Sequence, residues 1–445
     1  MRDGLKSYDP TREPVIRSDQ PARSDQPARS DHLPEFAPET FRVPGSLSED
    51  GTRGPEQVAD WGKIRFVHGS RHVSHFLRVG VETDVKRVAG FILEHWRLPR
   101  PALVVTVTGG ALDFEVSEEV MASLRAIPAA CSATGAWVFT GGGDSGVMKI
   151  VGETFRATQT ASPLIAVFPC GAAHGREDLV GLRGGTVHYN RKPPSREGAP
   201  LNGAHSHFVL VDNGTAGGAA YGSEMQLRAE LEKELAALAG GAIIMIAIQG
   251  GLGTLATVLA AAEAGKPSIL LAETGGASQT ICEFLAGGID KVTEQNFMND
   301  QIIEKLAAIK AVNDEAVRRG SQLLYPFGSK SKDSLVVMMR MAVGNSRHVT
   351  LDAPGGGDGG PSTTFTEKNH IGLALCSAVN WNQPDDVKAL MKQCSEEFLL
   401  RAFHLARKKV RNRPVARAAH RWQRALSPCG PHPFTPRCAR RTTSI

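Results

Sequence analysis

The stretch Ala242–Thr254 reads AIIMIAIQGGLGT and indicates the fold of this chain more clearly than any other. Its first seven residues are all apolar and partly β-branched, which is typical of a parallel strand buried on both faces. Three glycines follow within five residues, and residues 255–264 then have a helical pattern. A strand, a glycine loop and a helix in this order form the part of a βαβ unit that presents backbone N–H groups to an anion.

The same alternation recurs on both sides of this stretch. Short apolar runs predict further strands at 103–107, 136–140, 164–168, 207–211 and 268–271. Helical patterns occupy 83–95, 117–126, 147–154 and 224–239. The alternation predicts an α/β fold, a Rossmann-like doubly wound and mostly parallel sheet, followed by a smaller α-helical region.

Four of the predicted strands are followed by glycine-rich loops, which meet at the carboxyl edge of a parallel sheet. Glycine lets the backbone approach a phosphate closely. Three loops supply the candidate nucleotide-binding residues Thr108, Gly109, Gly110, Gly141, Gly142, Ser145, Gly146, Gly250, Gly251, Gly253 and Thr254, and the fourth loop is 274–276. No loop has the GK[ST] or the full GxGxxG pattern, which argues against ATP hydrolysis and NAD-dependent redox chemistry.

Arg228 is a candidate anion-binding residue on the predicted helix 224–239. Leucines at 227, 231, 235 and 238 form an apolar stripe along this helix. Ser223 and Gln226 have the spacing of a capping box, which predicts the start of the helix. Arg228 lies beside the stripe in the first two turns, where its guanidinium can turn toward an anion.

Two groups of histidines are candidate metal ligands. His68, His72 and His75 are interleaved with arginines in a segment typical of a surface, and His205 and His207 flank a serine before a strand. The second group has no acidic or thiolate neighbour, and the first has the character of a solvated segment, so we predict no metal site.

Asp144, Asp212 and Glu224 are the candidates for general acid or base chemistry, and each lies at a predicted loop or helix start. Carboxylates at such positions more often cap a helix than catalyse a reaction. No nucleophile elbow and no HExxH helix is present. The sequence therefore predicts no catalytic residue and no bound cofactor.

Charge and composition restrict the class of partner. The chain has 445 residues and a formal net charge of +5, and twelve basic residues but no acidic one lie between 398 and 445. The rest of the chain thus carries −7, so a nucleic-acid partner is not expected. The longest apolar run has seven residues, and the seven cysteines form no CxxC pair. These features predict no membrane-spanning segment and reduced thiols in the cytosol.

Changes in composition divide the chain into four predicted regions. Residues 1–57 are polar and contain the tandem repeat RSDQPA, so we expect them to be disordered. Residues 58–290 contain the α/β domain. Residues 291–395 are predicted to be a helical region that includes a GGGDGG linker, and 396–445 form a basic tail without a predicted fold.

Several motifs together resemble a known family. They are WGKIRF at 61–66, VVTVTGGALDF at 104–114, TGAWVFTGGGDSGVMKIV at 134–151, SHFVLVDNGTAGGAAYGSEMQLRAEL at 206–231 and QGGLGT at 249–254. Their order and spacing are similar to the N-terminal cytosolic homology region of the melastatin-type transient receptor potential (TRPM) cation channels. Residues 373–390, LALCSAVNWNQPDDVKAL, are similar to the helical repeat that follows that region. The resemblance implies a SLOG-type nucleotide-sensing domain whose ligand is ADP-ribose or a related nucleotide.

The resemblance also implies roles for single residues. Tyr221 and Arg228 match an aromatic residue and an arginine of the nucleotide-binding members, which implies stacking by the ring and pairing of the guanidinium with phosphate. Two positions depart from the family pattern, since Gly276 stands in place of an arginine and Leu112 in place of a lysine. Each missing cation removes a charge-assisted hydrogen bond of about 1.5–3 kcal/mol.

Two functions remain as hypotheses. The favoured one is a nucleotide-sensing regulatory domain with a small-molecule nucleotide as partner, compatible with a homo-oligomer or with association with channel subunits. It would be cytoplasmic as an isolated chain and membrane-associated as part of a truncated channel. The alternative is a soluble SLOG-fold enzyme similar to the phosphoribohydrolases. Their PGGxGTxxE pattern is altered here to Gln249 and Thr257, so the catalytic glutamate has no counterpart.

Overall fold

A computed structural model of the chain describes residues 41–43, 57–67, 73–160, 162–190, 198–239, 243–293, 299–331 and 334–344. All of them belong to one compact unit, Glu35–Ile445. The predicted linker at 355–360, the helical repeat at 373–390 and the basic tail at 396–445 lie outside the described residues.

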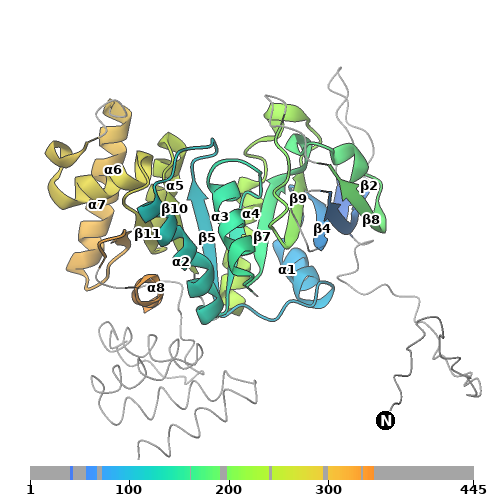
Figure 1. Cartoon of the computed structure of the whole chain (residues 1–445), viewed down its shortest axis with the longest axis horizontal. Coiled ribbons are helices and arrows are strands. Elements are labelled where there is room, and N and C mark those ends of the chain that lie inside the picture. Colours follow the sequence, from blue (N-terminus) through green and yellow to red (C-terminus); the bar gives the residue numbers. More distant parts are fainter. Residues whose placement is uncertain are drawn as a thin grey trace, which may run out of the picture. The chain divides into compact units, whose positions relative to one another are not determined.

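A ten-stranded sheet forms the centre of the fold (Figure 1). Its strands, in spatial order, are β12 (Leu324–Phe327), β11 (Ser268–Leu271), β10 (Ile243–Ile248), β5 (Leu103–Gly109), β6 (Ala136–Thr140), β7 (Leu164–Pro169), β9 (His207–Asp212), β4 (Val73–Gly80), β3 (Trp61–Phe66) and β8 (Arg183–Tyr189). Every neighbouring pair is parallel except β3 and β4. The predicted mostly parallel, Rossmann-like fold is confirmed.

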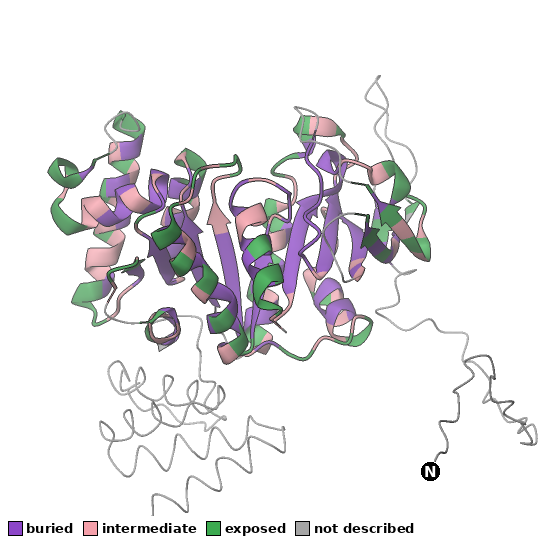
Figure 2. Cartoon of the chain, viewed as in Figure 1, coloured by how far each residue is buried: buried purple, intermediate pink, exposed green. Residues whose placement is uncertain are grey.

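Helices cover both faces of this sheet, because alternate residues of each strand point to opposite sides. Val104 and Met245 face one side, which is covered by α1 (Val85–Glu94), α4 (Met225–Leu238), α5 (Leu252–Glu263), α6 (Gly276–Gly287) and α7 (Asp300–Arg318). Val105 and Ile246 face the other side, which is covered by α2 (Glu118–Thr134), α3 (Gly146–Thr158) and α8 (Leu335–Gly344). The strands are accordingly buried while the outer surfaces of the helices are exposed (Figure 2).

The strand order reverses at β5. From β5 the chain continues outward through β6 and β7, reaches β8 at the far edge, comes back to β9, and then returns through α4 to β10 on the other side of β5. A reversal of this kind opens a space between the flanking loops at the carboxyl ends of the strands, where α/β proteins bind their ligands. The fold therefore makes the carboxyl edge of β5 and β10 the expected position of a ligand site.

Four strands of the sheet were not predicted from the sequence. Two of them, β3 and β8, lie at one edge. Residues of β3 alternate between buried and exposed, and β8 is exposed or half-buried except at Tyr189, so both lack the continuous apolar run that marks the central strands. At the opposite edge, β12 contains Pro326, a residue that is tolerated only where no further strand needs its missing N–H group.

The fourth strand, β4, contains the charged Arg78 and the polar residues Ser74 and His75 among its apolar residues. Arg78 lies 2.6 Å from an oxygen of Asp60 and 2.7 Å from an oxygen of Asp212, and all three residues are buried. Burial of an arginine is costly unless carboxylates are held against it. Asp60 and Asp212 come from distant segments, so the sequence pattern around Arg78 alone could not indicate a strand.

The ordered domain extends beyond both boundaries expected from the sequence. Phe41 is completely buried and packs edge-to-face on Phe91 at a centroid distance of 5.7 Å, and β1 (Arg42–Val43) pairs with β2 (Gln57–Val58). These residues correct the predicted disorder of 1–57 at its C-terminal part. Beyond residue 290, α7, β12 and α8 complete the same sheet and core, so the predicted boundary at 290 cuts through the domain.

The expected capping box at the start of α4 is also absent. The helix begins at Met225 with Glu224 as its N-cap, and the Ser223 hydroxyl has no hydrogen-bond partner among the described residues. Glu224 instead accepts a hydrogen bond of 3.0 Å from the Gly222 N–H. Within the described part of the chain, no helix combines the length and apolar character needed to cross a bilayer.

Ending the chain at Asp290 should abolish cooperative folding, whereas ending it at Gly344 should preserve it. The shorter chain loses the buried residues Leu306, Ile309, Leu324 and Met339 with their neighbours. Each large apolar side chain contributes about 1.5–3 kcal/mol, so the total loss exceeds the roughly 5–15 kcal/mol by which a domain is stable. Thermal unfolding monitored by circular dichroism would measure this, and a sharp transition in the shorter chain would contradict it.

Candidate functional site

The four glycine loops that the sequence predicted at the carboxyl edge lie against one another. The Gly110 N–H donates to the carbonyl of Ile248 at 3.4 Å, and the Val147 N–H donates to the carbonyl of Gly110 at 2.9 Å. The Ala277 N–H donates to the carbonyl of Gly250 at 2.8 Å. These hydrogen bonds join the loops after β5, β6, β10 and β11 into one surface.

Glycine is required where these loops touch. Gly276 has a φ of +57°, and a Cβ on it would lie 2.3 Å from the carbonyl oxygen of Gly250. Gly146 has a φ of +54°, and its Cβ would lie 2.2 Å from the carbonyl oxygen of Gly110. Because no side chain fits at Gly276, this backbone cannot carry the arginine that the family pattern has there.

The start of α3 already holds an anion from the protein itself. Asp113, in the loop after β5, accepts a 2.7 Å hydrogen bond from the Gly146 N–H and one of 3.1 Å from the Lys149 ammonium. These hydrogen bonds lower the pKa of the Asp113 carboxyl. Ser145 is the N-cap of α3 but makes no capping hydrogen bond with its side chain. The predicted phosphate contact at Gly146 is therefore occupied by Asp113.

The start of α6 is also engaged by the protein. The N–H groups of Ala277 and Ser278 donate to the carbonyls of Gly250 and Gln249, at 2.8 and 3.1 Å. The first backbone N–H groups of α3 and α6, two of the predicted anion-binding helix starts, thus bond to the neighbouring loops. They hold these loops together instead of facing a ligand.

The start of α5 differs, because its first backbone donors are open. The N–H groups of Gly251, Leu252 and Gly253 have no hydrogen-bond partner among the described residues. No atom lies within 4 Å of the Cβ position of either glycine. An α-helix carries a partial positive charge at this end, so these three donors form an accessible anion-binding position at the carboxyl edge.

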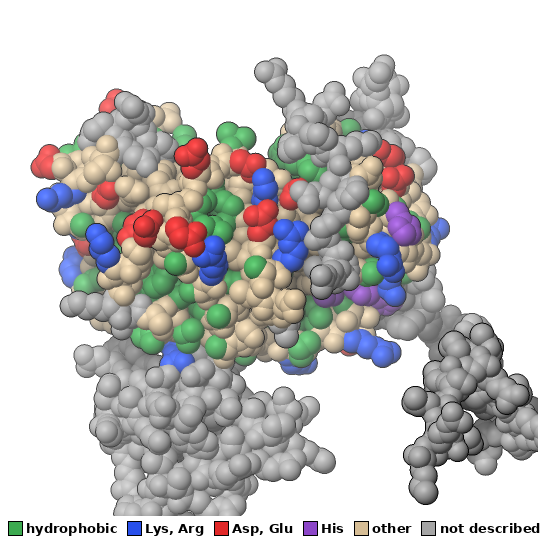
Figure 3. All heavy atoms as spheres, viewed as in Figure 1, with side chains coloured by type: hydrophobic (Ala, Val, Ile, Leu, Met, Phe, Trp, Pro, Cys, Tyr) green, Lys and Arg blue, Asp and Glu red, His purple; other side chains and the backbone are tan. Residues whose placement is uncertain are grey.

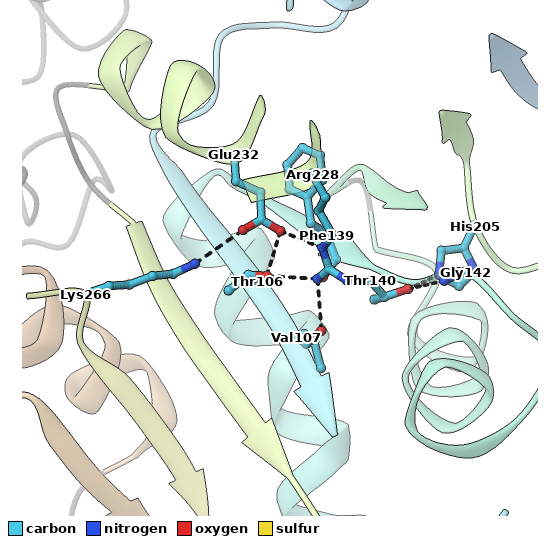
Figure 4. A network of polar contacts seen from close by, with 9 residues as sticks. All are labelled: Thr106, Val107, Phe139, Thr140, Gly142, His205, Arg228, Glu232 and Lys266. Atoms are coloured by element: carbon cyan, nitrogen blue, oxygen red, sulfur yellow. Dashed lines mark hydrogen bonds and ion pairs between the residues drawn. The ribbon is translucent and has the colours of Figure 1, made fainter. Parts of the chain in front are cut away.

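Arg228 projects from the first turn of α4 toward the same edge (Figure 4). Its Nη2 donates to the Thr106 hydroxyl at 2.9 Å and to the carbonyls of Val107 and Phe139 at 3.1 and 3.2 Å. Its Nε donates to Glu232 at 2.9 Å. The guanidinium therefore lies at the carboxyl ends of β5 and β6, where most of its hydrogen bonds go to the protein itself.

Glu232 was not identified from the sequence, although it sits at the centre of this network. It is buried on α4 and contacts both Arg228 and Lys266, the latter at 3.3 Å. Burial alone raises the pKa of the Glu232 carboxyl, but the charges of Lys266 and Arg228 lower it below its ordinary value. The four-residue spacing of Arg228 and Glu232 was a signal for their contact, whereas nothing local indicated Lys266.

Tyr221 occupies the same edge farther along the sheet. Its side chain is half exposed, and its ring meets that of Phe168, at the end of β7, edge-on with centroids 6.4 Å apart. The exposed ring leaves a surface on which a base or ribose can stack. Thr108 and Gly109 end β5, Gly141 and Gly142 follow β6, and Thr254 is buried in the first turn of α5.

A buried hydrogen-bond network shapes the loop after β6. The Nε2 of His205 lies 2.7 Å from the Thr140 hydroxyl, which also accepts a hydrogen bond from the Gly142 N–H at 2.9 Å. Asn202, beside His205, donates to Asp144 at 2.7 Å. His205 and Asp144 thus fix loop geometry, and their burial argues against contact with a substrate.

His75 and His207 lie together at the opposite, amino edge, with stacked rings 5.5 Å apart. His68 and His72 lie outside the described residues. Within the described ranges, no group of three or more His, Cys, Asp or Glu side chains is arranged to hold a metal ion. Basic and acidic side chains are interspersed over the face drawn in Figure 3, so an anion site there depends on local geometry.

His75 should make the stability of the fold sensitive to acid. Burial, with the nearby charges of Lys63 and His95, lowers the pKa of His75 below 6.5. The unfolded chain therefore binds a proton more readily, so stability falls as the pH drops below about 6.5. When the pH is lowered from 7.5 to 5.5, the free energy of unfolding measured in urea should fall less for His75→Gln than for the wild type. His188→Gln, at an exposed position, should lose as much stability as the wild type. An equal fall in the wild type and both variants would contradict the role of His75.

Gly276→Ala should destabilise the protein more than Gly320→Ala does. Both glycines have positive φ, which costs a non-glycine residue roughly 1–2 kcal/mol, but no atom lies within 4 Å of the Cβ position of Gly320. Only Gly276 adds the clash with Gly250. Urea unfolding midpoints would measure the difference, and equal losses would mean that the Gly250 loop can move aside freely.

Comparison with known proteins identifies the family of this fold. Residues 74–324 match the sequence profile of the family described as "SLOG in TRPM". The chain is 32% identical over 251 residues to transient receptor potential cation channel subfamily M member 2 of Mus musculus, covering 52% of this chain and 16% of that protein. It is 28% identical over 312 residues to the member-like 2 protein of Nematostella vectensis, covering 65% and 19%.

A third relative is subfamily M member 7 of Rattus norvegicus, with 30% identity over 249 residues, 53% of this chain and 13% of that protein. The aligned region thus spans less than a fifth of the length of each of these relatives. The family match includes β4 to the start of β12 and covers more than half of the chain. This chain belongs to the family of SLOG domains found in the N-terminal regions of TRPM channels.

Proposed function

We propose that this SLOG domain binds an extended anionic nucleotide, of which ADP-ribose is the type, and that it acts as a regulatory domain without turnover. The observation that carries the proposal is the open start of α5, with three unpaired backbone donors next to the strand-order reversal at β5 and β10. Both α4, which carries Arg228, and α5 contact these two strands. Backbone donors and a guanidinium are the groups that bind phosphate in proteins.

The length of the site favours a ligand larger than a mononucleotide. Tyr221 lies at the end of β7, Arg228 at the ends of β6 and β5, and the start of α5 follows β10. From β10 to β7 there are three strand spacings, or roughly 14 Å at about 4.8 Å each. A base on Tyr221 with phosphate groups between Arg228 and α5 would require an extended molecule such as a nucleoside diphosphate sugar.

The names of the relatives support a cellular setting for this proposal. Their names describe cation channels, so we infer that the chain regulates, or forms part of, a channel subunit. Association with other subunits and with the membrane belongs to this inference. A nucleotide that bridges α4 and α5 could change how the two helices pack, which is one physical route from binding to regulation.

An enzymatic function of the phosphoribohydrolase type is less well supported. The position at which such enzymes have a glutamate is Thr257, whose hydroxyl donates to the Gly253 carbonyl within α5 at 2.8 Å. A hydroxyl engaged in this way cannot act as an acid or base at neutral pH. Release of free base from a nucleoside monophosphate, measured by chromatography, would nevertheless promote the enzyme hypothesis.

Titration calorimetry of the full chain with ADP-ribose should show binding, and Arg228→Ala should weaken it roughly 10- to 100-fold. That range corresponds to one charge-assisted hydrogen bond of about 1.5–3 kcal/mol. Arg318→Ala, which removes an exposed arginine on α7, is the matched control and should bind like the wild type. Absence of heat and of thermal shift with ADP-ribose, cyclic ADP-ribose, AMP and NAD would refute the proposal.

A further inference from the structure

Three charged side chains form a buried cluster behind the candidate nucleotide site (Figure 4). The side chains of Arg228, Glu232 and Lys266 are 19%, 4% and 14% exposed. Two positive charges and one negative charge leave a net charge of +1 inside the domain. A buried excess charge is costly unless an opposite charge approaches it, so the cluster is electrostatically suited to an anion.

Glu232 distributes its two oxygens between the two cations. Oε1 accepts hydrogen bonds from Arg228 Nε at 2.9 Å and from the Thr106 hydroxyl at 2.6 Å, while Oε2 accepts one from Lys266 Nζ at 3.3 Å. Because Thr106 has a single hydroxyl proton and donates it to Glu232, its oxygen is free to accept from Arg228 Nη2. Glu232 thereby orients both Arg228 and the threonine that supports it.

These contacts determine which part of the guanidinium remains available. Nε and Nη2 are taken up by Glu232, Thr106 and the carbonyls of Val107 and Phe139. Nη1 has no hydrogen-bond partner in the described part of the chain. A planar guanidinium with two nitrogens fixed can present the third in only one direction.

The Glu232 carboxyl remains ionised in this setting. Lys266 and Arg228 together lower its pKa despite its burial, and burial lowers the pKa of Lys266. Lys266 reaches Glu232 from the turn between α5 and β11, which is the end of α5 opposite its open N–H groups. The cluster therefore connects α4, β5 and the far end of α5.

We propose that Glu232 and Lys266 are positioning residues for the nucleotide, holding the Arg228 guanidinium so that Nη1 faces the ligand phosphate with a net charge of +1 behind it. This inference rests on the proposed function. Stability alone does not call for such a cluster, since buried ion pairs are often replaced by apolar residues at little cost. A positioning role explains why three charged side chains occupy a place where apolar side chains would give a stable fold.

The test is a double-mutant cycle in the full chain, with ADP-ribose and adenosine as probes. Glu232→Gln places an amide N–H₂ against the Lys266 ammonium, which displaces the side chain from Arg228, so ADP-ribose should bind about 10-fold more weakly. Lys266→Met leaves the cluster neutral and should weaken binding several-fold. In the double variant, the glutamine oxygen can again accept from Arg228 and Thr106 beside an uncharged methionine, so affinity should return to within about 3-fold of the wild type.

Adenosine distinguishes positioning from general damage to the domain. Because adenosine has no phosphate, each variant should bind it as the wild type does. The matched control is Glu230→Gln, which changes an exposed glutamate on the same helix and should leave both affinities unchanged. If Glu232→Gln does not fold, as judged by circular dichroism, the double variant and Thr106→Val carry the test, the latter with an expected loss of about 5-fold.

Four different results would overturn the inference. Wild-type binding of ADP-ribose by Glu232→Gln, or no recovery in the double variant, would refute the positioning role while leaving the proposed function intact. Failure of the wild-type chain to bind any of ADP-ribose, cyclic ADP-ribose, AMP and NAD would refute the proposed function and this inference together. An equal loss of affinity for adenosine and ADP-ribose would assign the cluster to structure alone.

Discussion

The pairing of β10 with β5 is the interaction on which the rest of this structure depends. The six residues from Ile243 to Ile248 lie in parallel register with the last six of β5, and both strands are buried on both faces. Since β10 follows β9 in the sequence but pairs with β5, the connection must cross the sheet, and α4 makes that crossing. The same pairing brings the open start of α5 and the first turn of α4 to one edge, so the candidate site is a direct consequence of the strand order.

A buried arginine, Arg78, and a partly buried one, Arg228, illustrate how the domain distributes charge. Arg78 is held by two carboxylates, Asp60 and Asp212, which leave that cluster with a net charge of −1 and tie the first strands to β9. Arg228 shares a single carboxylate with Lys266 and keeps a net charge of +1. The first arrangement excludes an additional anion, whereas the second favours one. The difference lies in the number of carboxylates, since both guanidinium groups are well shielded from water.

The glycine loops combine two roles that a sequence pattern does not separate. At α3 and α6 the helix starts are used internally, by Asp113 and by the carbonyls of Gln249 and Gly250, and this keeps the loops in contact. At α5 the donors stay open. The absence of an arginine at position 276 has a steric cause, because a Cβ there meets the Gly250 carbonyl. The nucleotide that we propose for this site would therefore meet no side-chain cation from position 276.

The sequence by itself determined the central strands, the alternation of strands and helices, and the family, because continuous apolar runs and glycine loops are local signals. Prediction from the sequence failed where the structure of a segment depends on residues that are close in space but distant in the chain. Helix α2 continues through Pro128 to Thr134 because Ile127 and Cys131 are buried in the core. The strand β4 tolerates Arg78 because distant carboxylates neutralise it. Only the tertiary structure determined that Lys266 and Glu232 hold Arg228 and that, among the described helix starts after the glycine loops, α5 keeps its first N–H groups open while α3 and α6 do not, since these contacts join residues far apart in the chain.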